Sequence, residues 1–124
     1  MLGNNEVCAV LAVKDLEAAK KFYGETLGLE GSKESDGGIF YKSGKSGVFI
    51  YPSQYAGTNQ ATAAAWDVDD IEAAVAELKD KGVTFEHYDL PGATLEGDIH
   101  IMGELKSAWF KDPDGNILNL VKGM

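Results

Sequence analysis

Short apolar runs alternate along the chain with segments whose apolar residues recur at helical spacing. The run V-C-A-V-L-A-V at residues 7–13 is typical of a buried strand. After it, Leu16, Ala19, Tyr23 and Leu27 fall on one face of a helix. Further apolar runs follow, and the first half of the chain is predicted to form strands at residues 7–13, 29–35, 39–43 and 48–52.

The same pattern occurs a second time. Residues 13–19 read V-K-D-L-E-A-A, and residues 68–74 read V-D-D-I-E-A-A. Asp15 and Asp70 are placed to cap the N-terminus of each helix, because a side-chain oxygen can accept a hydrogen bond from a free backbone N–H. The chain is therefore predicted to consist of two similar modules.

Each module is predicted to have the order β-α-β-β-β. Gly28 and Gly82 stand where a left-handed residue is expected after each helix. The second module is predicted to form strands at residues 62–68, 83–90, 105–111 and 116–121. Residues 53–61 are a polar linker, and residues 91–104 are an insertion that we expect to be a long, functional loop.

These elements predict an α+β fold. Residues 1–124 are expected to be one domain made of two tandem βαβββ modules, about 1–55 and 60–124. The helices should cover the outside of a concave, partly closed mixed sheet, whose other face is turned to a cavity, to the other module or to a partner subunit.

Composition narrows the range of partners. Acidic residues outnumber basic ones by 20 to 11, so the net charge of -9 disfavours nucleic acid and anionic membranes and favours a cationic ligand. No apolar stretch approaches the roughly 20 residues of a membrane span. A lone cysteine and the lack of a signal-like N-terminus predict a cytoplasmic protein.

Two motifs carry a resemblance to a known family. Val13-Lys14-Asp15-Leu16 continues through Phe22-Tyr23 to Leu27-Gly28-Leu29, and F-K-D-P-D-G-N follows at residues 110–116. With the paired modules, this pattern resembles the vicinal oxygen chelate superfamily of glyoxalases, extradiol dioxygenases and bleomycin-resistance proteins. The motif residues are caps, turns and packing positions, so the resemblance implies the fold more than an activity.

In the metalloenzymes of that superfamily, His and Glu at four strand positions hold a divalent metal. The resemblance places Cys8, Ile50, Ala63 and Asn119 at these positions. Ile and Ala cannot bind a metal, and a catalytic zinc site generally needs three protein ligands. We therefore expect no metal at the usual site and no other cofactor, with these four residues lining a ligand cavity instead.

Asn119 interrupts an apolar strand, and a buried amide needs a partner. It either orients a bound molecule or bonds a neighbouring group. Alternation and the resemblance place Trp109 and Ser107 on the same side. Trp109 is either a flat wall for an aromatic or cationic ligand or a residue of the core or a dimer interface.

The remaining candidates are a thiol and two imidazoles. Cys8 is expected mid-strand and inert, and His87 is expected to be exposed. His100 lies in the insertion near Glu104, where it is either an ordinary loop histidine or half of an acid–base pair at the cavity mouth.

Two functions remain open. The first is a metal-free small-molecule-binding protein of the bleomycin-resistance type, with a cationic or aromatic ligand in a hydrophobic cavity. The resemblance further implies a homodimer, in which modules pack within a chain or swap between subunits. The alternative is a lyase, isomerase or dioxygenase-like enzyme, metal-free or with a displaced metal, that uses His100 as acid–base. The sequence leaves open whether any reaction is catalysed.

Overall fold

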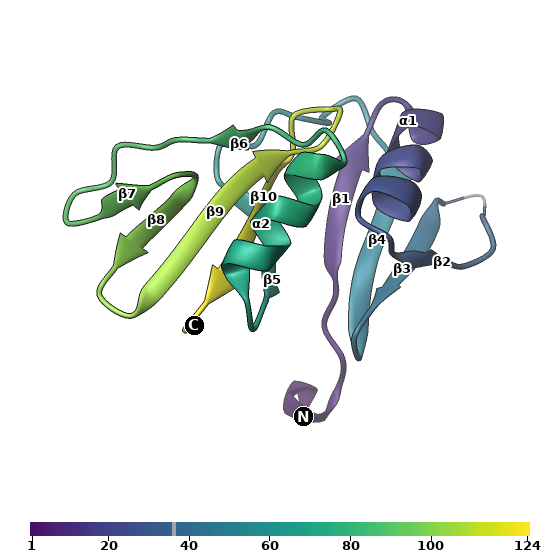
Figure 1. Cartoon of the computed structure of the whole chain (residues 1–124). Helices are drawn as coiled ribbons and strands as arrows, with labels where there is room; N and C mark the ends of the chain where they lie inside the picture. Colours follow the sequence, from purple (N-terminus) through teal and green to yellow (C-terminus); the bar gives the residue numbers. More distant parts are fainter. Residues whose placement is uncertain (36) are drawn as a thin grey trace. The chain divides into compact units, whose positions relative to one another are not determined.

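The computed structural model describes residues 1–35 and 37–124. The chain forms two compact units: unit 1 contains Met1–Gln60 and Asp112–Asn116, and unit 2 contains Ala61–Lys111 and Ile117–Met124 (Figure 1). Unit 1 contains η1 (Leu2–Asn4), β1 (Ala9–Val13), α1 (Leu16–Lys20), η2 (Lys21–Thr26), β2 (Glu30–Gly31), β3 (Ile39–Ser43) and β4 (Ser46–Pro52).

The sheet of unit 1 has the strand order β1-β4-β3-β2, with β1 parallel to β4 and the other pairs antiparallel. One face is fully buried and carries Leu11, Val13, Ile39, Tyr41, Val48 and Ile50. The ring of Tyr23 in η2 lies 6.2 Å from that of Tyr41, so this is the face that the helix covers. The burial of these apolar side chains drives the folding of the unit.

The first helix begins and ends as the sequence predicts. The Asp15 carboxylate accepts a hydrogen bond from the backbone N–H of Ala18, and Gly28 has a φ of 72°. Between these points α1, in which Ala19 is buried, passes into a π-helical turn, η2, in which Tyr23 is buried. The predicted cap and the glycine stop are confirmed, but the pattern gives no sign of the π turn.

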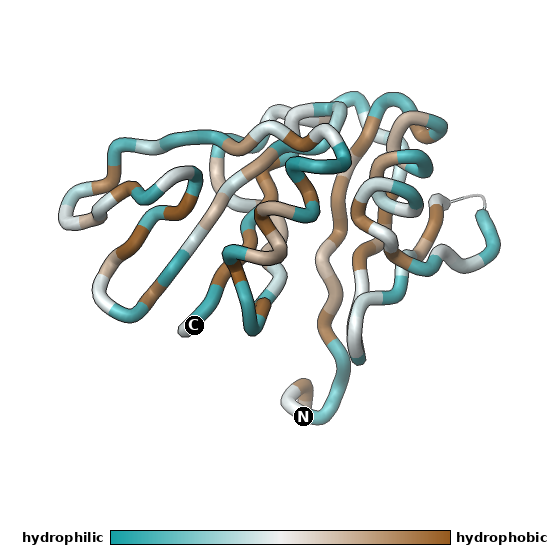
Figure 2. Tube along the Cα trace, viewed as in Figure 1, coloured by the Kyte–Doolittle hydropathy of each residue, from teal (hydrophilic) through white to brown (hydrophobic). Residues whose placement is uncertain are grey.

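Unit 2 repeats this topology. It contains β5 (Thr62–Asp67), α2 (Ile71–Asp80), β6 (Phe85–Glu86), β7 (Thr94–Glu96), β8 (Ile99–Met102), β9 (Leu105–Lys111) and β10 (Ile117–Lys122). The strand order is β5-β10-β9-β8-β7, and β6 also pairs with β9. Asp70 caps α2 through the N–H of Ala73, and α2 packs on β9 and β10. Apolar and polar segments alternate along α2 (Figure 2), as in an amphipathic helix.

The insertion at residues 91–104 is not a loop, as we expected, but a β-hairpin. Its strands β7 and β8 pair with each other, and β8 continues the sheet by pairing His100 with Ser107 and Met102 with Leu105 of β9. Within the hairpin, Ile99 and His100 are buried, whereas Leu95 and Met102 are exposed. Backbone pairing with β9 thus sets the conformation of the insertion.

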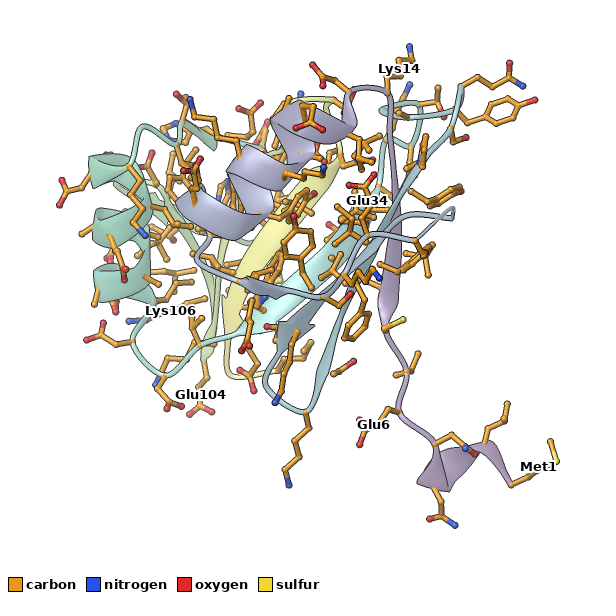
Figure 3. All side chains as sticks on the ribbon, turned by 90° about the vertical axis from the view of Figure 1, so that its right-hand side faces the viewer. Met1, Glu6, Lys14, Glu34, Glu104 and Lys106 are labelled. Carbon is orange, nitrogen blue, oxygen red and sulfur yellow. The ribbon has the colours of Figure 1, made fainter. Side chains whose placement is uncertain are left out.

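Several strands are shorter than the apolar runs suggest. In place of the predicted strands at 29–35 and 83–90, the structure has the two-residue strands β2 and β6. The first strand begins at Ala9, so Cys8 is not mid-strand but exposed in the segment before β1. That segment, which includes Met1 and Glu6, extends beyond the end of β1 (Figure 3). Our prediction that Cys8 lies in the middle of a strand was therefore wrong.

The α+β class and the tandem modules are confirmed. The strands form two open mixed sheets, one for each unit, rather than the single partly closed sheet that we predicted. No helix in residues 1–35 and 37–124 is long and apolar enough to cross a membrane.

The turn between β9 and β10 belongs to unit 1 and is organised by a buried carboxylate. Asp112 is 5% exposed. Its Oδ2 accepts hydrogen bonds from the Tyr23 hydroxyl at 2.7 Å and from Asn116 Nδ2 at 2.8 Å. Its Oδ1 accepts from the backbone N–H groups of Asp114 and Asn116. Asn116 Nδ2 also donates to the Ala12 carbonyl of β1 at 2.8 Å. The D-P-D-G-N motif thus connects its own turn to η2 and to β1 by hydrogen bonds.

Tyr23→Phe removes one donor from the Asp112 carboxylate and keeps the ring. We expect the free energy of unfolding to fall by about 1.5–3 kcal/mol, the usual contribution of a hydrogen bond to a charged group. Urea denaturation measures this loss. Tyr55→Phe is the matched control, because Tyr55 is 68% exposed and should leave stability unchanged.

The same pair of variants tests a pH dependence. Burial, and then the charge and hydrogen bond of Asp112, raise the pKa of Tyr23 above its usual value of 10.0. The folded protein therefore keeps this proton when the unfolded chain loses it, so the contribution is complete below pH 10 and is lost as the pH rises further. Wild type and Tyr55→Phe should lose stability more steeply above pH 10 than Tyr23→Phe. Equal slopes for all three proteins would contradict this.

Candidate functional site

Four of the predicted site residues come together on one face of the unit 2 sheet. Asn119 of β10 pairs directly with Trp109 of β9, and Ser107 of β9 pairs with His100 of β8. Residues paired across adjacent strands point to the same side of a sheet, and alternation along β9 puts Trp109 and Ser107 on that side together. α2 packs on the opposite side, where Leu118, Leu120 and Phe110 are buried. The predicted grouping of Asn119, Trp109 and Ser107 is therefore what unit 2 shows.

Asn119 is buried, with 6% of its surface exposed, and it has a partner within its own sheet. Its Nδ2 donates to the Ala108 carbonyl at 3.4 Å, which is a long and weak hydrogen bond. The structure thus gives one answer to the question of why an amide interrupts this strand. The same weak bond leaves Asn119 able to form a better one, and a role in orienting a ligand stays a prediction.

Three aromatic side chains form a cluster beside these strands. The ring centroid of His100 lies 4.9 Å from that of Trp109, and that of Tyr88 lies 5.4 Å from Trp109, both nearly edge to face. Trp109 is itself held in place, since its indole N–H donates to Thr62 Oγ1 at 3.0 Å. Edge-to-face contacts of this kind fix the orientation of each ring.

A pocket of about 350 Å³ opens onto this cluster. His87, Tyr88, Asp89, Leu90, Ala93, Leu95 and His100 line it, all from the segment that follows β6 and from the β7–β8 hairpin. Trp109 is not among the lining residues; it supports the rings of Tyr88 and His100. Trp109 therefore contacts the pocket through its neighbours rather than as a flat wall, which was one of the two roles that the sequence left open.

His100 is not a loop residue, as we had considered, but a buried member of β8. It is 3% exposed, and its Nε2 accepts a hydrogen bond from the backbone N–H of Tyr88 at 2.9 Å. Glu104 lies in the turn between β8 and β9, exposed, with its side chain directed outward (Figure 3). This arrangement does not support the acid–base pair of His100 and Glu104, which was one of the two alternatives for His100.

The rim of the pocket carries a small charged network. His87 is exposed, as predicted, and its Nε2 lies 2.7 Å from Asp98 Oδ1. Lys79 at the end of α2 donates to Asp98 Oδ2 at 2.8 Å. The hydrogen bond from Lys79, and then that from His87, lower the pKa of Asp98 below its usual value. An ionised Asp98 thus joins α2, the residue after β6 and the turn of the β7–β8 hairpin.

The other predicted site residues occupy different surroundings. Ile50 was expected to face a cavity, but it is 0% exposed and pairs with Ile39 on the side of the unit 1 sheet that the helix covers. Cys8 is exposed before β1. Ala63 lies where the β5–β10 pairing shifts register between Thr62 and Ala64. Because side chains alternate, Phe49 and Tyr51, not Ile50, occupy the other face of β4.

The residues that the resemblance assigns to the four metal-ligand positions of the metalloenzymes do not fit a divalent metal. They are a thiol, an alkyl side chain, a methyl group and a neutral amide, and replacing Ile50 by its neighbours Phe49 or Tyr51 adds no carboxylate or imidazole. Within residues 1–35 and 37–124, no group of three or more His, Cys, Asp or Glu side chains is arranged to hold an ion. A catalytic site of the zinc type needs about three such ligands.

Sequence reasoning missed Tyr88, Ala93 and Leu95, which line the pocket with His100. Tyr88 follows a two-residue strand, and the other two belong to an insertion that we expected to be a loop. The alternation within I-H-I-M at residues 99–102 was the available signal. It indicates a strand, but it does not show which strand of the sheet it joins.

Comparisons with known structures agree on this fold. The structure resembles TnmS3, an antibiotic-binding protein from Streptomyces sp. CB03234, with a TM-score of 0.70 and 23% identity over 98% of each chain. It also resembles a lactoylglutathione lyase from Agrobacterium tumefaciens, with a TM-score of 0.69 and 20% identity over 97% of this chain and 94% of that one. At these identities the likeness shows the fold alone.

A third similar structure is a glyoxalase/bleomycin resistance protein from Streptomyces sp. CB03234, with a TM-score of 0.65 and 22% identity over 94% of this chain and 98% of that one. None of the curated proteins matches the sequence significantly. One family model matches residues 7–120, which is nearly the whole chain. The chain belongs to the Glyoxalase/Bleomycin resistance protein/Dioxygenase superfamily.

Proposed function

We propose that this chain is a metal-independent small-molecule-binding protein that takes an aromatic ligand in the pocket of unit 2. The observation that carries the proposal is the pocket of about 350 Å³ lined by Tyr88 and His100, whose rings are fixed by Trp109. Pockets that combine apolar and aromatic walls with a few polar groups are typical of small-molecule sites. An antibiotic-binding protein among the similar structures supports the same class of function.

Charge supports a neutral or cationic ligand over an anionic one. Asp89 lines the pocket, and the chain carries a net charge of -9. Such a field attracts cations and repels anions. The preference for a cationic or aromatic ligand is therefore part of the proposal.

The enzyme alternative has less support. A general base needs a nitrogen free to take a proton from the substrate. The Nε2 atom of His100 is engaged by the Tyr88 N–H, and Glu104 is exposed in the β8–β9 turn. Binding without turnover is the function that these contacts favour.

The binding proposal predicts that small aromatic compounds raise the thermal stability of the protein. We would test 1-tetralone, tetralin, quinoline and the cationic dye proflavine by thermal shift and calorimetry. Saturation 100-fold above Kd stabilises the folded state by about 2.7 kcal/mol. A panel in which no compound binds would contradict the proposal.

Ala93→Trp locates the site, because a large side chain there fills the pocket, while Ala76→Trp on the exposed side of α2 is the matched control. Binding should be lost in the first variant and kept in the second. A second pocket, of about 570 Å³ in unit 1, is lined by Val13, Lys14, Pro52, Ser53 and Gln54, none of them aromatic. Ligand binding that survives Ala93→Trp would direct attention to that pocket instead.

Metal independence has its own test. Protein purified without a tag or chelator and then dialysed should carry far less than one equivalent of any transition metal, as measured by inductively coupled plasma mass spectrometry. Ligand affinity should not change when a chelator is added. One equivalent of metal that survives dialysis would refute this part of the proposal.

We further propose that the protein is a cytoplasmic homodimer. The exposed thiol of Cys8 suits a reducing compartment, and Val7 and Val10 expose 83% and 58% of their surface beside it. Light scattering should give about twice the chain mass of 13.3 kDa. Val10→Glu should shift the protein toward monomer. A monomer at all concentrations in wild type would overturn the dimer.

A further inference from the structure

Two residues that line the pocket each carry a buried polar atom that the described part of the chain leaves without a partner. His100 Nδ1 and the Tyr88 hydroxyl have no hydrogen-bond partner among the described residues, although both atoms are buried. His100 is 97% buried, since 3% of its surface is exposed. Most buried polar groups in native proteins are paired, so two unpaired atoms on neighbouring rings in one pocket call for an explanation.

The hydrogen-bonding role of His100 follows from its other nitrogen. Nε2 accepts the backbone N–H of Tyr88 at 2.9 Å, so Nε2 carries a lone pair and no hydrogen. A neutral imidazole then has its hydrogen on Nδ1. A hydrogen on Nε2 would face the hydrogen of the Tyr88 backbone N–H across the 2.9 Å between the two nitrogens, which is unfavourable. His100 therefore carries a fixed N–H donor that no described residue uses.

Both groups are held in place by the sheet and the cluster. His100 belongs to β8, where it pairs with Leu95 of β7 on one side and with Ser107 of β9 on the other. Trp109 packs edge to face on the rings of His100 and Tyr88. Trp109 cannot supply the missing partner through its indole N–H, because that group donates to Thr62. A donor that is positioned in advance and unpaired is what a ligand acceptor needs.

We propose that the ligand is a planar aromatic compound whose ring carries a conjugated carbonyl, and that His100 Nδ1–H donates to this carbonyl oxygen. The Tyr88 hydroxyl supplies a second hydrogen bond to the ligand. The acceptor is a neutral carbonyl rather than a carboxylate or phosphate, because Asp89 lines the pocket and the chain has a net charge of -9. This inference rests on the proposed binding function and specifies its ligand class.

A matched pair of probes separates the two proposals. 1-Tetralone and tetralin have the same bicyclic frame and differ by a carbonyl in place of a methylene. We expect calorimetry to show that the ketone binds about 100-fold more tightly, because each of the two hydrogen bonds to its oxygen should contribute about tenfold. Equal affinities would overturn the carbonyl inference and leave the binding function intact. Failure of both probes, and of the wider panel, would contradict the binding function itself.

Tyr88→Phe provides a variant whose two effects should have opposite signs. The hydroxyl is unpaired in the free protein, so its removal should leave the Tm unchanged or raise it. The same variant should bind 1-tetralone about tenfold more weakly and tetralin as well as wild type does. A lower Tm with an equal loss for both probes would indicate a structural role and overturn the inference.

His100→Gln tests the second donor, because the glutamine oxygen can accept the Tyr88 N–H in place of Nε2 while the Nδ1 donor is lost. It should also lower the affinity for the ketone selectively. Nitrogen NMR of His100 in the wild-type protein needs no variant. A neutral ring with hydrogen on Nδ1, whose signal moves with 1-tetralone and not with tetralin, is expected. A ring with hydrogen on Nε2 would overturn the inference.

Discussion

The buried carboxylate of Asp112 is the interaction on which unit 1 depends. Among the described residues it accepts hydrogen bonds from Tyr23, from the backbone of Asp114 and from both the backbone and the side chain of Asn116. An isolated charge in this position would be strongly unfavourable, and these donors replace the water it has lost. Because Asn116 also donates to Ala12, the network joins the π turn after α1, the Asp-Pro turn and β1.

The hydrogen bonds of Asp112 and Asn116 also explain why a turn between two strands of unit 2 belongs to unit 1. The chain leaves unit 2 at the end of β9, contributes residues 112–116 to unit 1, and continues in unit 2 with β10. The strands on either side carry Trp109 and Asn119, paired directly across the ladder. The motif most characteristic of the chain therefore has a structural role, and the candidate chemistry lies in the strands that it connects.

Unit 2 contains two buried polar groups without partners on neighbouring rings. His100 Nδ1 and the Tyr88 hydroxyl have no hydrogen-bond partner among the described residues. In unit 1 the Asp112 carboxylate and the Tyr23 hydroxyl are paired, and Asp114 Oδ2 is a buried atom without a partner within residues 1–35 and 37–124. An unpaired buried donor lowers stability, and a sequence under selection for stability alone would replace it. Such groups are common where a protein gives up stability for binding. Tyr88 follows β6 and His100 lies in β8, so both groups belong to residues that line the pocket of unit 2.

The sequence by itself determined the elements whose signals are local. The caps at Asp15 and Asp70 and the stops at Gly28 and Gly82 depend on a few neighbouring residues, and they lie where the pattern predicts. The repeat of 55 residues gave the tandem topology. Alternation back from Asp112, together with the resemblance, placed Ser107 and Trp109 on the side of Asn119, and the β9–β10 pairing agrees because it runs without a bulge from the turn.

Tertiary structure decided what depends on distant partners. Ile50 lies on the helix-covered face because an error of one residue reverses the side to which a strand residue points, and only pairing with Ile39 fixes that register. His100 is buried because β8 joins β9, a long-range pairing that its neighbours do not encode. The pocket needs Tyr88, the hairpin and Trp109 together, and their contacts exist only once the sheet of unit 2 has formed.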